Sequence, residues 1–326
     1  MVTTRGAARP KTVRRAVHGV LLLDKETGLT SNAAVQRAKR IFRAEKVGHT
    51  GTLDPLASGL LPLCFGAATK FAQASLDADK RYLATLQLGV TTTTGDGEGE
   101  VRSVRDVSVD RAGLESTCAG FVGTIDQIPP MHSALKRDGK PLYDYARAGI
   151  EFEREPRRVT IHSIRVVEGE GTRWTIDVSC SKGTYIRTLG EDIGEALGCG
   201  AHLAALRRTG CGALSLAAAL SWSDLDDGDE VALDRCLVPV DALVAGLPKI
   251  VLSPEDAGRL LAGVRRRIDL PDSPAVRVYG PEPGAFLGTA HIAGGELIAT
   301  RLLSPAEVGA LIACHSTSPE PESLPA

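Results

Sequence analysis

A carboxylate in a glycine-rich loop is the first group in this chain that could do chemistry. Asp54 lies in the string GHTGTLDPLASG at residues 48–59, whose glycines permit sharp turns and close approach of the backbone to a ligand. Leucines at positions 53, 56, 60 and 61 would remove part of its water, and a charge that leaves water needs a partner. The sequence therefore predicts a cation from elsewhere in the chain, although an Asp-Pro pair taken alone more often forms a simple turn.

The twelve-residue string resembles the catalytic loop of TruB-type tRNA pseudouridine synthases almost end to end. The resemblance implies that Asp54 is the catalytic residue. A second string, SKGTYIRTL at residues 181–189, is similar to the family signature whose arginine pairs with that aspartate, which implies that Arg187 holds Asp54 ionised and oriented. We expect Tyr185 in the same string to be one of the substrate-binding residues. Taken alone, Arg187 is typical of a solvated helix surface.

Further matches to the family place apolar and aromatic groups around the target base. Tyr82 follows Lys80 and Arg81 as the active-site tyrosine does in that family, which implies stacking on the base and a hydroxyl that assists proton transfer. Leu206 matches an apolar residue that packs the pocket. From the residues alone, Tyr82 is equally a core aromatic of a strand, and Leu206 is equally plain core.

An N-terminal motif also matches, with one departure. Residues 24–31, DKETGLTS, resemble the family's first motif and place Lys25 among the substrate-binding residues, but Glu26 stands where the family usually has proline. This puts a rigid turn in doubt and leaves Asp54 unaffected. His49 matches a histidine that enters the RNA loop when the target nucleotide leaves its stack. A lone histidine is more often a surface or satisfied residue.

Charge placement says more about partners than the net charge of −2. Basic clusters occur at residues 37–46, 136–140, 154–158, 207–208 and 265–267, and acidic residues gather at 96–100 and 224–230. We expect a basic face with the acidic segments directed away from it. Lys136, Arg137 and Lys140 lie in a long basic insertion, where binding loops tend to occur. Each cluster taken alone is typical of a solvated surface.

Apolar patterns predict strands at 18–24, 81–88, 158–167 and 173–180, and helices at 30–43, 67–76, 110–121 and 184–197. Residues 91–100 read as a polar loop and 223–248 as including a linker. A helix begins at Ser253, and short strands follow near 275–278, 288–291 and 296–301. Helices and strands are interspersed without a βαβ rhythm, which favours an α+β fold with a mixed sheet.

The domain organisation that we expect has four parts. Residues 1–15 form a disordered basic arm, 16–245 the catalytic domain with an RNA-clamping insertion at 126–158, 246–314 a small β-rich module, and 315–326 a disordered tail. The family resemblance covers about residues 19–212. The C-terminal module is similar, more weakly, to the RNA-binding PUA domains.

The resemblance implies that the protein isomerises uridine 55 in the T-arm of tRNA to pseudouridine. Asp54 could attack C1′, stabilise an oxocarbenium-like centre or remove a sugar proton, and the sequence does not choose among these. An isomerisation of this kind needs no redox cofactor and, with a carboxylate at the sugar, no metal. The alternatives are a tRNA-folding chaperone or structural RNA binder without turnover, and a hydrolase that releases uracil.

Other features set the expected cellular context. Cys199, His202 and Cys211 suggest zinc but lack a fourth ligand at standard spacing, so we expect no metal. Seven scattered cysteines favour a reducing compartment. No apolar run is long enough to span a membrane, and the N-terminus lacks the apolar core of a secretory signal. We expect a cytoplasmic monomer with tRNA as its partner.

Overall fold

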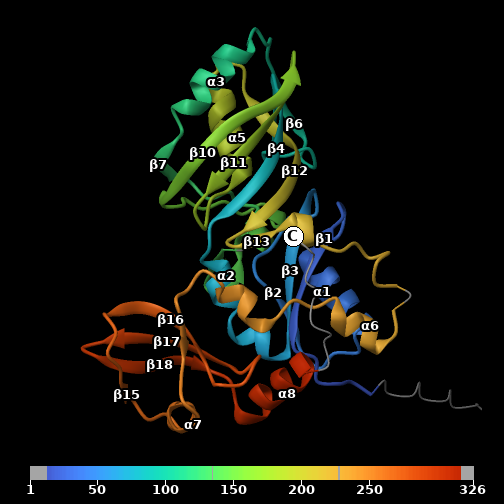
Figure 1. Cartoon of the computed structure of the whole chain (residues 1–326). Helices are drawn as coiled ribbons and strands as arrows, with labels where there is room; N and C mark the ends of the chain where they lie inside the picture. Colours follow the sequence, from blue (N-terminus) through green and yellow to red (C-terminus); the bar gives the residue numbers. More distant parts are fainter. Residues whose placement is uncertain (1–12, 134, 227, 317–326) are drawn as a thin grey trace, which may run out of the picture.

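A computed structural model describes residues 13–133, 135–226 and 228–316. A large mixed sheet runs through the molecule in the order β1-β3-β12-β4-β11-β10-β7, with β2 on β3 and β13 on β12. Figure 1 shows this sheet as the long axis of an extended molecule, with a smaller β-rich module at one end. The strands of the large sheet are β1 (Gly19–Lys25), β2 (Val47–His49), β3 (Ala57–Phe65), β4 (Lys80–Leu88), β7 (Gly123–Gln127), β10 (Arg157–Glu170), β11 (Arg173–Cys180), β12 (Ala201–Cys211) and β13 (Leu214–Ser215).

Helices cover the sheet where the sequence places apolar residues at helical spacing. Thr30 caps the first of them, because its side chain accepts a hydrogen bond from the Ala33 N–H at 3.1 Å. Asp110 caps another in the same way, through the Gly113 N–H at 2.8 Å. The helices of this part of the chain are α1 (Ser31–Ile41), α2 (Ala72–Leu76), α3 (Arg111–Ala119), α4 (Leu142–Arg147), α5 (Ile186–Ala196) and α6 (Glu230–Arg235), with 3₁₀ turns η1 (Gly66–Lys70), η2 (Leu216–Ala218) and η3 (Val240–Val244).

The C-terminal module has its own sheet, in the order β14-β16-β17-β18-β15. Its apolar core is continuous with the side of the large sheet near η1, where Phe71 packs against Phe286 with ring centroids 5.1 Å apart. Its elements are β14 (Lys249–Val251), α7 (Pro254–Leu261), β15 (Arg266–Arg267), β16 (Ser273–Tyr279), β17 (Phe286–Ala293), β18 (Glu296–Leu302) and α8 (Pro305–Ser316). This arrangement confirms the expected α+β class with a mixed sheet and a β-rich C-terminal module.

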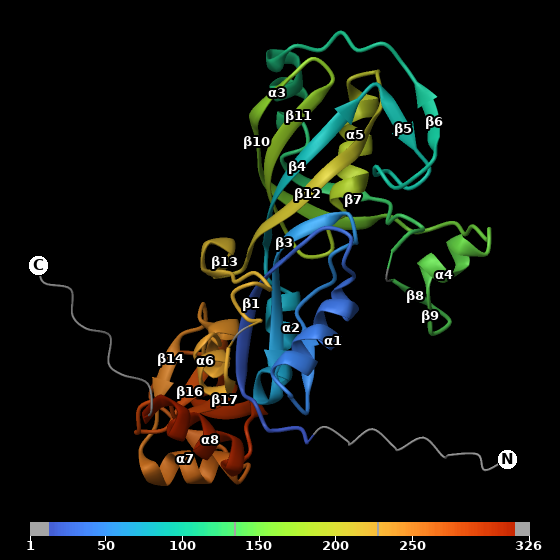
Figure 2. The same ribbon diagram turned by 90° about the vertical axis from the view of Figure 1, so that its right-hand side faces the viewer.

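Two small hairpins leave the large sheet. One pairs β5 (Val90–Thr92) with β6 (Val101–Val104), and the other pairs β8 (Lys136–Arg137) with β9 (Lys140–Pro141). Figure 2 shows β8, β9 and α4 projecting together from the side of the molecule. They belong to the predicted insertion, which is shorter than 126–158 because β7 extends to Gln127 and β10 begins at Arg157, both within the large sheet.

Several predictions of local structure differ from what forms. The helix expected at 67–76 is broken at Phe71, which has φ −109° and ψ 3° and points into the C-terminal core. The segment 223–248 holds α6 and η3, and Val238 pairs with Val20 of β1, so it packs against the large sheet. Residues 1–12 and 317–326, part of the predicted arm and tail, lie outside the described residues. Arg15, placed in that arm, forms an ion pair with Asp234 at 2.7 Å.

Candidate active site

The loop that carries Asp54 connects β2 to β3 and is held from below by the N-terminal motif. Ser31 Oγ donates to the Leu53 carbonyl at 3.0 Å and accepts from the Leu53 N–H at 2.8 Å. The Gly28 N–H donates to the Pro55 carbonyl at 2.7 Å, and the Ala57 N–H closes a turn onto the Asp54 carbonyl at 3.0 Å. The Asp-Pro turn therefore forms, and it leaves the Asp54 side chain free to point into a cleft, with 42% of its surface exposed.

Arg187 at the start of α5 meets that carboxylate. Its Nη2 lies 3.0 Å from Asp54 Oδ2, although the two residues are far apart in sequence. The guanidinium also donates to the carbonyls of Thr94 at 3.1 Å and His132 at 2.7 Å. Arg187 is the buried member of the pair, with 7% of its side chain exposed, so these three partners hold it in place while the carboxylate faces the cleft.

A second carboxylate completes this arrangement. Asp96 is buried, and its Oδ2 lies 3.6 Å from Arg187 Nε. Its Oδ1 accepts from Thr94 Oγ1 at 2.5 Å and from the Glu98 N–H at 3.1 Å. Asp96 thus departs from the expectation that the acidic segment 96–100 is directed away from the basic groups, because it faces inward as a partner of the buried guanidinium.

The other acidic segment also departs from the prediction. Asp226 pairs with Arg37 at 3.2 Å, and Glu230 pairs with Arg43 at 2.8 Å. Asp226 and Glu230 therefore lie against the basic cluster of residues 37–46 and partly neutralise it, so that cluster is not an open basic face.

The cleft above Asp54 has a volume of about 520 Å³. Its walls combine the Asp54 loop, the start of α1, the loop after β5, and the insertion, and its lining residues include His49, Asn32, Glu98, Tyr143 and Arg147. His49 Nδ1 accepts from the Gly51 N–H at 3.2 Å, and burial, together with the charge of Arg208, lowers the His49 pKa. His49 therefore presents a neutral ring at the cleft near pH 7.

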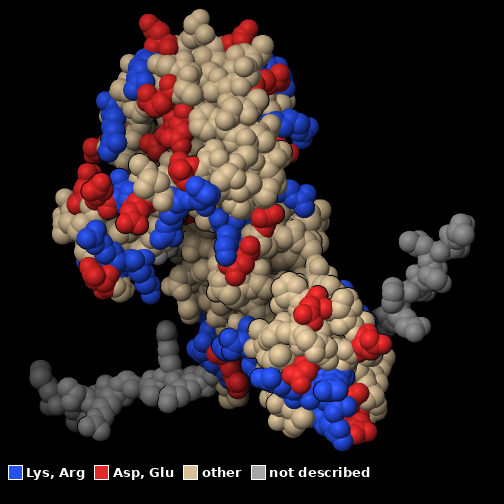
Figure 3. Space-filling view, turned by 90° about the vertical axis from the view of Figure 1, so that its left-hand side faces the viewer, with Lys and Arg blue, Asp and Glu red and all other residues tan. Residues whose placement is uncertain are grey.

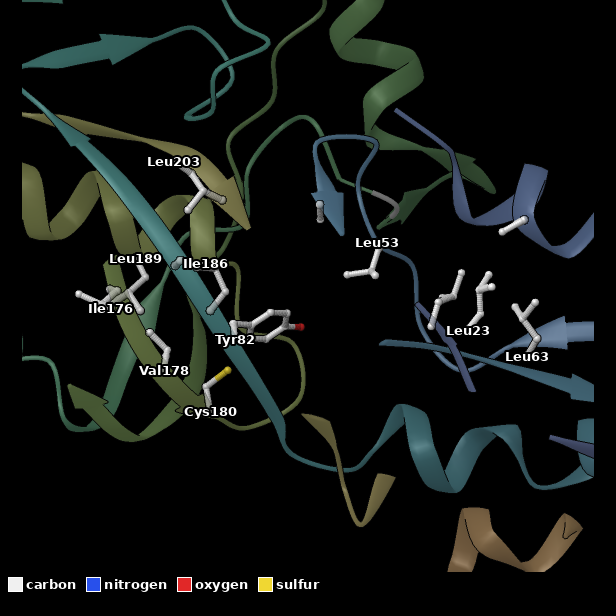
Figure 4. Packing of buried hydrophobic residues seen from close by; sticks show 14 of the residues in the cluster. Leu23, Leu53, Leu63, Tyr82, Ile176, Val178, Cys180, Ile186, Leu189 and Leu203 are labelled. Atoms are coloured by element: carbon white, nitrogen blue, oxygen red, sulfur yellow. The ribbon is translucent and has the colours of Figure 1, made fainter. Parts of the chain in front are cut away.

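Tyr82 and Leu206 lie next to the loop but outside the lining of this cleft. Figure 4 shows Tyr82 reaching from β4 toward the side where Leu53 lies. Burial raises the Tyr82 pKa to about 12, so its hydroxyl is protonated at neutral pH. Leu206 on β12 lies in register between Ala57 of β3 and Ala84 of β4, which places it directly beside the loop that carries Asp54.

Lys25, expected among the substrate-binding residues, lies inside the N-terminal motif. Its side chain is fully buried, and Nζ donates to the carbonyls of Glu26 at 2.8 Å and Leu29 at 2.7 Å. Desolvation lowers its pKa to about 8, against the attraction of Asp54. Lys25 thus closes the turn of the N-terminal motif from inside, while the Glu26 carboxylate is exposed and lies 3.9 Å from Arg37.

Tyr185 and the insertion border the site on its other side. Buried Gln127 accepts from the Tyr185 N–H at 2.7 Å and donates to the Tyr185 carbonyl at 3.0 Å, which fixes the chain just before Arg187. Lys136, Arg137 and Lys140 are exposed on the β8–β9 hairpin. Two of them rest on aromatic rings: Arg137 lies 4.2 Å from the Phe152 ring centre and Lys140 lies 4.9 Å from that of Tyr145. Figure 3 shows Lys and Arg side chains gathered, with acids among them, on the lobe that projects at mid-height.

The residues of the suggested zinc cluster have separate partners. His202 Nδ1 contacts the Val90 carbonyl at 2.9 Å, and Cys211 Sγ lies 3.2 Å from Ser75 Oγ.

No helix in the described parts of the chain is both long and apolar enough to cross a bilayer.

Comparison with known proteins defines the class first. The model of the TruB family pseudouridylate synthase N-terminal domain matches residues 39–186, and the tRNA pseudouridylate synthase B C-terminal domain matches 187–245. A third model, pseudouridine synthase II TruB, C-terminal, matches 248–303. The fold and these matches define a pseudouridine synthase, an isomerase.

Relatives and solved structures agree with this class. The tRNA pseudouridine synthase B of Cupriavidus pinatubonensis is 56% identical over 304 residues, which are 90% of this chain and 96% of that protein. The protein of the same name from Burkholderia mallei is 54% identical, covering 92% of this chain and 98% of its own. A Cbf5-Nop10-Gar1 complex contains a chain with a TM-score of 0.71 at 25% identity, covering 93% of both chains. The chain belongs to the TruB family.

Proposed function

We propose that this protein converts uridine 55 in the T-arm of tRNA to pseudouridine, with Asp54 as the catalytic carboxylate and Arg187 as its partner. The observation that carries the proposal is the contact of 3.0 Å between a half-exposed carboxylate and a buried guanidinium at the wall of a cleft. The names of its relatives, tRNA pseudouridine synthase B, support tRNA as the substrate.

The chemistry begins at the sugar of the extruded uridine. Breaking the C1′–N1 bond leaves positive charge at C1′, which an ionised Asp54 meets as nucleophile, as electrostatic partner or as base toward a sugar proton. Arg187 keeps the carboxylate oriented in each case. The uracil then turns, its C5 bonds to C1′, the C5 proton leaves and N1 takes up a proton.

The surrounding groups hold the free uracil and the RNA in place. Tyr82 stacks on the base and Leu206 packs behind it, which excludes water and prevents hydrolysis. The target leaves its stack at a cost of a few kcal/mol, and His49 fills the vacated place. Lys136, Arg137 and Lys140 contact phosphates from the insertion, and Tyr185 borders the pocket. The protein works as a cytoplasmic monomer.

Incubation of the protein with an unmodified tRNA transcript, followed by base-resolved detection of pseudouridine, tests the proposal. We expect one modified position, at uridine 55, and none with Asp54→Asn, which binds tRNA with an affinity close to that of the wild type because the amide keeps the shape of the carboxylate. Free uracil would instead show a hydrolase. Tight binding with no product from the wild type would show a tRNA-folding chaperone or structural binder. Normal product from Asp54→Asn would remove Asp54 from the mechanism.

A further inference from the structure

Three buried cations beneath the Asp54 loop, Lys25, Lys80 and Arg208, bond to backbone carbonyls, and Arg208 also contacts the Tyr82 hydroxyl. Arg208 is 1% exposed, and it donates from Nε to the Leu60 carbonyl at 2.8 Å and from Nη2 to the Gly51 carbonyl at 3.3 Å. Lys25 is bonded to two carbonyls as described above, and Lys80 donates to those of residues 75, 76 and 78. Within the described residues, no Asp or Glu forms an ion pair with any of the three.

A buried cation without a carboxylate is costly, because carbonyl dipoles replace only part of its hydration. Arg208 is the central one of the three: its charge lowers the pKa of Lys25, Lys80 and His49, each of which lies near the loop. The region below the loop therefore holds positive charge that no ion pair within the described residues neutralises, although Asp54 attracts Lys25 from the cleft. Such charge is expected where a reaction creates an anion.

Arg208 also lies close to one of the residues assigned to the target base. On β12 it lies in register with Tyr82 of β4, two residues beyond Leu206. Its guanidinium reaches under the loop to Gly51 and Leu60, and its charge acts on the Tyr82 hydroxyl. Arg208 thus lies behind the two residues that the proposed function assigns to the target base, whereas Arg187 serves the carboxylate at the sugar.

Cleavage of the glycosidic bond makes the uracil anionic. The electron pair of the C1′–N1 bond goes to N1 and spreads to the O2 and O4 carbonyls, whichever of the three roles Asp54 plays. The charge is lost again when C5 bonds to C1′, the C5 proton leaves and N1 is protonated. A fixed cation in low dielectric stabilises this transient charge without having to reorganise.

We propose that Arg208 is a positioning residue that holds the Asp54 loop through the Gly51 and Leu60 carbonyls and places positive charge behind the anionic uracil as it forms. This rests on the proposed function. It predicts that the contribution of Arg208 depends on how basic the departing base is, which a residue needed only for packing would not show.

The test compares two substrates in one variant. The single-turnover rate at which the target nucleotide is consumed is measured for tRNA with uridine and for tRNA with 5-fluorouridine. The anion of 5-fluorouracil is less basic than that of uracil and leaves more readily. Arg208→Met should lower the rate on uridine by about 100-fold and the rate on 5-fluorouridine by about 10-fold, with tRNA affinity changed by less than about threefold. Equal losses on both substrates would overturn the proposal.

Controls separate charge from packing. A partly unfolded sample lowers the rates on both substrates equally, so the ratio of the two rates is unaffected. If Arg208→Met does not fold, Arg208→Gln is used in its place. Arg208→Lys keeps the charge, so the ratio of its rate on uridine to its rate on 5-fluorouridine should equal that of the wild type. A ratio like that of Arg208→Met would contradict a role for the charge. Lys80 is a matched buried cation whose hydrogen bonds go to residues 75, 76 and 78 and not to the loop. Lys80→Met should lower both rates alike, and a selective loss there would overturn the assignment to Arg208. If the wild-type protein makes no pseudouridine, the proposed function is refuted, and not the role of Arg208.

Discussion

Oδ2 of Asp96 lies 3.6 Å from Nε of Arg187, and both side chains are buried. Arg187 therefore has a carboxylate on each side, one enclosed by protein and one open to the cleft. The enclosed one keeps the guanidinium fixed whether or not substrate covers Asp54. This relationship gives the first prediction.

Asp96→Asn should lower the single-turnover rate of pseudouridine formation about 100-fold. The amide keeps the acceptor for Thr94 but removes the charge that holds Arg187, whose buried cation then has Asp54 as its only carboxylate partner within the described site. The free energy of unfolding should fall by about 3 kcal/mol, as for a broken buried ion pair. Urea unfolding measures it. Glu100→Gln, an exposed carboxylate of the same loop, is the control and should change neither quantity; wild-type activity of Asp96→Asn would refute the role.

Gly59→Ala should destabilise the protein by more than about 2 kcal/mol. Gly59 has φ +96°, and a Cβ there would collide with the backbone of Arg208 on the adjacent strand β12. Gly48→Ala is the matched control, because a Cβ there meets nothing within 4 Å. Thermal or urea unfolding of both variants decides the matter, and equal stabilities would show that β3 and β12 can separate at this point without cost.

Replacing Lys136, Arg137 and Lys140 together with glutamine should weaken tRNA binding and reduce the slope of log affinity against log salt by about 2. The three cations are exposed on the hairpin beside the cleft, where phosphates can reach them. Binding is measured across a series of salt concentrations. A double replacement of Arg165 and Arg173, exposed on β10 and β11, should leave the slope unchanged. An unaltered slope in the triple variant would mean that the hairpin does not touch phosphate.

The buried Lys25 should make the stability of the folded protein depend on pH. Its pKa in the folded protein is about 8, against an ordinary 10.5, so the unfolded chain binds more protons between those values. The free energy of unfolding of the wild type should therefore rise with pH across this window, relative to Lys25→Met, by about 2–3 kcal/mol. Urea unfolding of both proteins at pH 7, 9 and 10.5 measures the difference. A constant difference would show that Lys25 is not desolvated in the folded state.

The motifs around Asp54 and Arg187 could be recognised because local strings carried them. Asp96 could not, since an acid among glycines looks like a solvated loop until a guanidinium from residue 187 lies against it. Ser31 and Gln127 act through hydrogen bonds to the backbone of distant segments, and no local pattern marks such partners. These groups depend on tertiary contacts, which a sequence pattern does not contain.

The local sequence does not predict the strands β3 and β12, for a related reason. Both faces of β3 are covered, so its residues run apolar without alternation and contain Gly59 and Pro62. β12 contains the string LAALRR at residues 203–208, which is rich in helix-forming residues. Its place between β3 and β4 overrides that local preference.

The position of β12 has a consequence for how the protein is made. It lies between β3 and β4 and joins the first strands of the chain to the rest of the large sheet, yet it is the last long strand of that sheet to be synthesised. On the ribosome, the strands within residues 19–65 and those within 80–180 therefore cannot join into one sheet until residue 211 has left the exit tunnel. A nascent chain cut short before β12 would have its carboxylate loop and its guanidinium but no strand to bring them together.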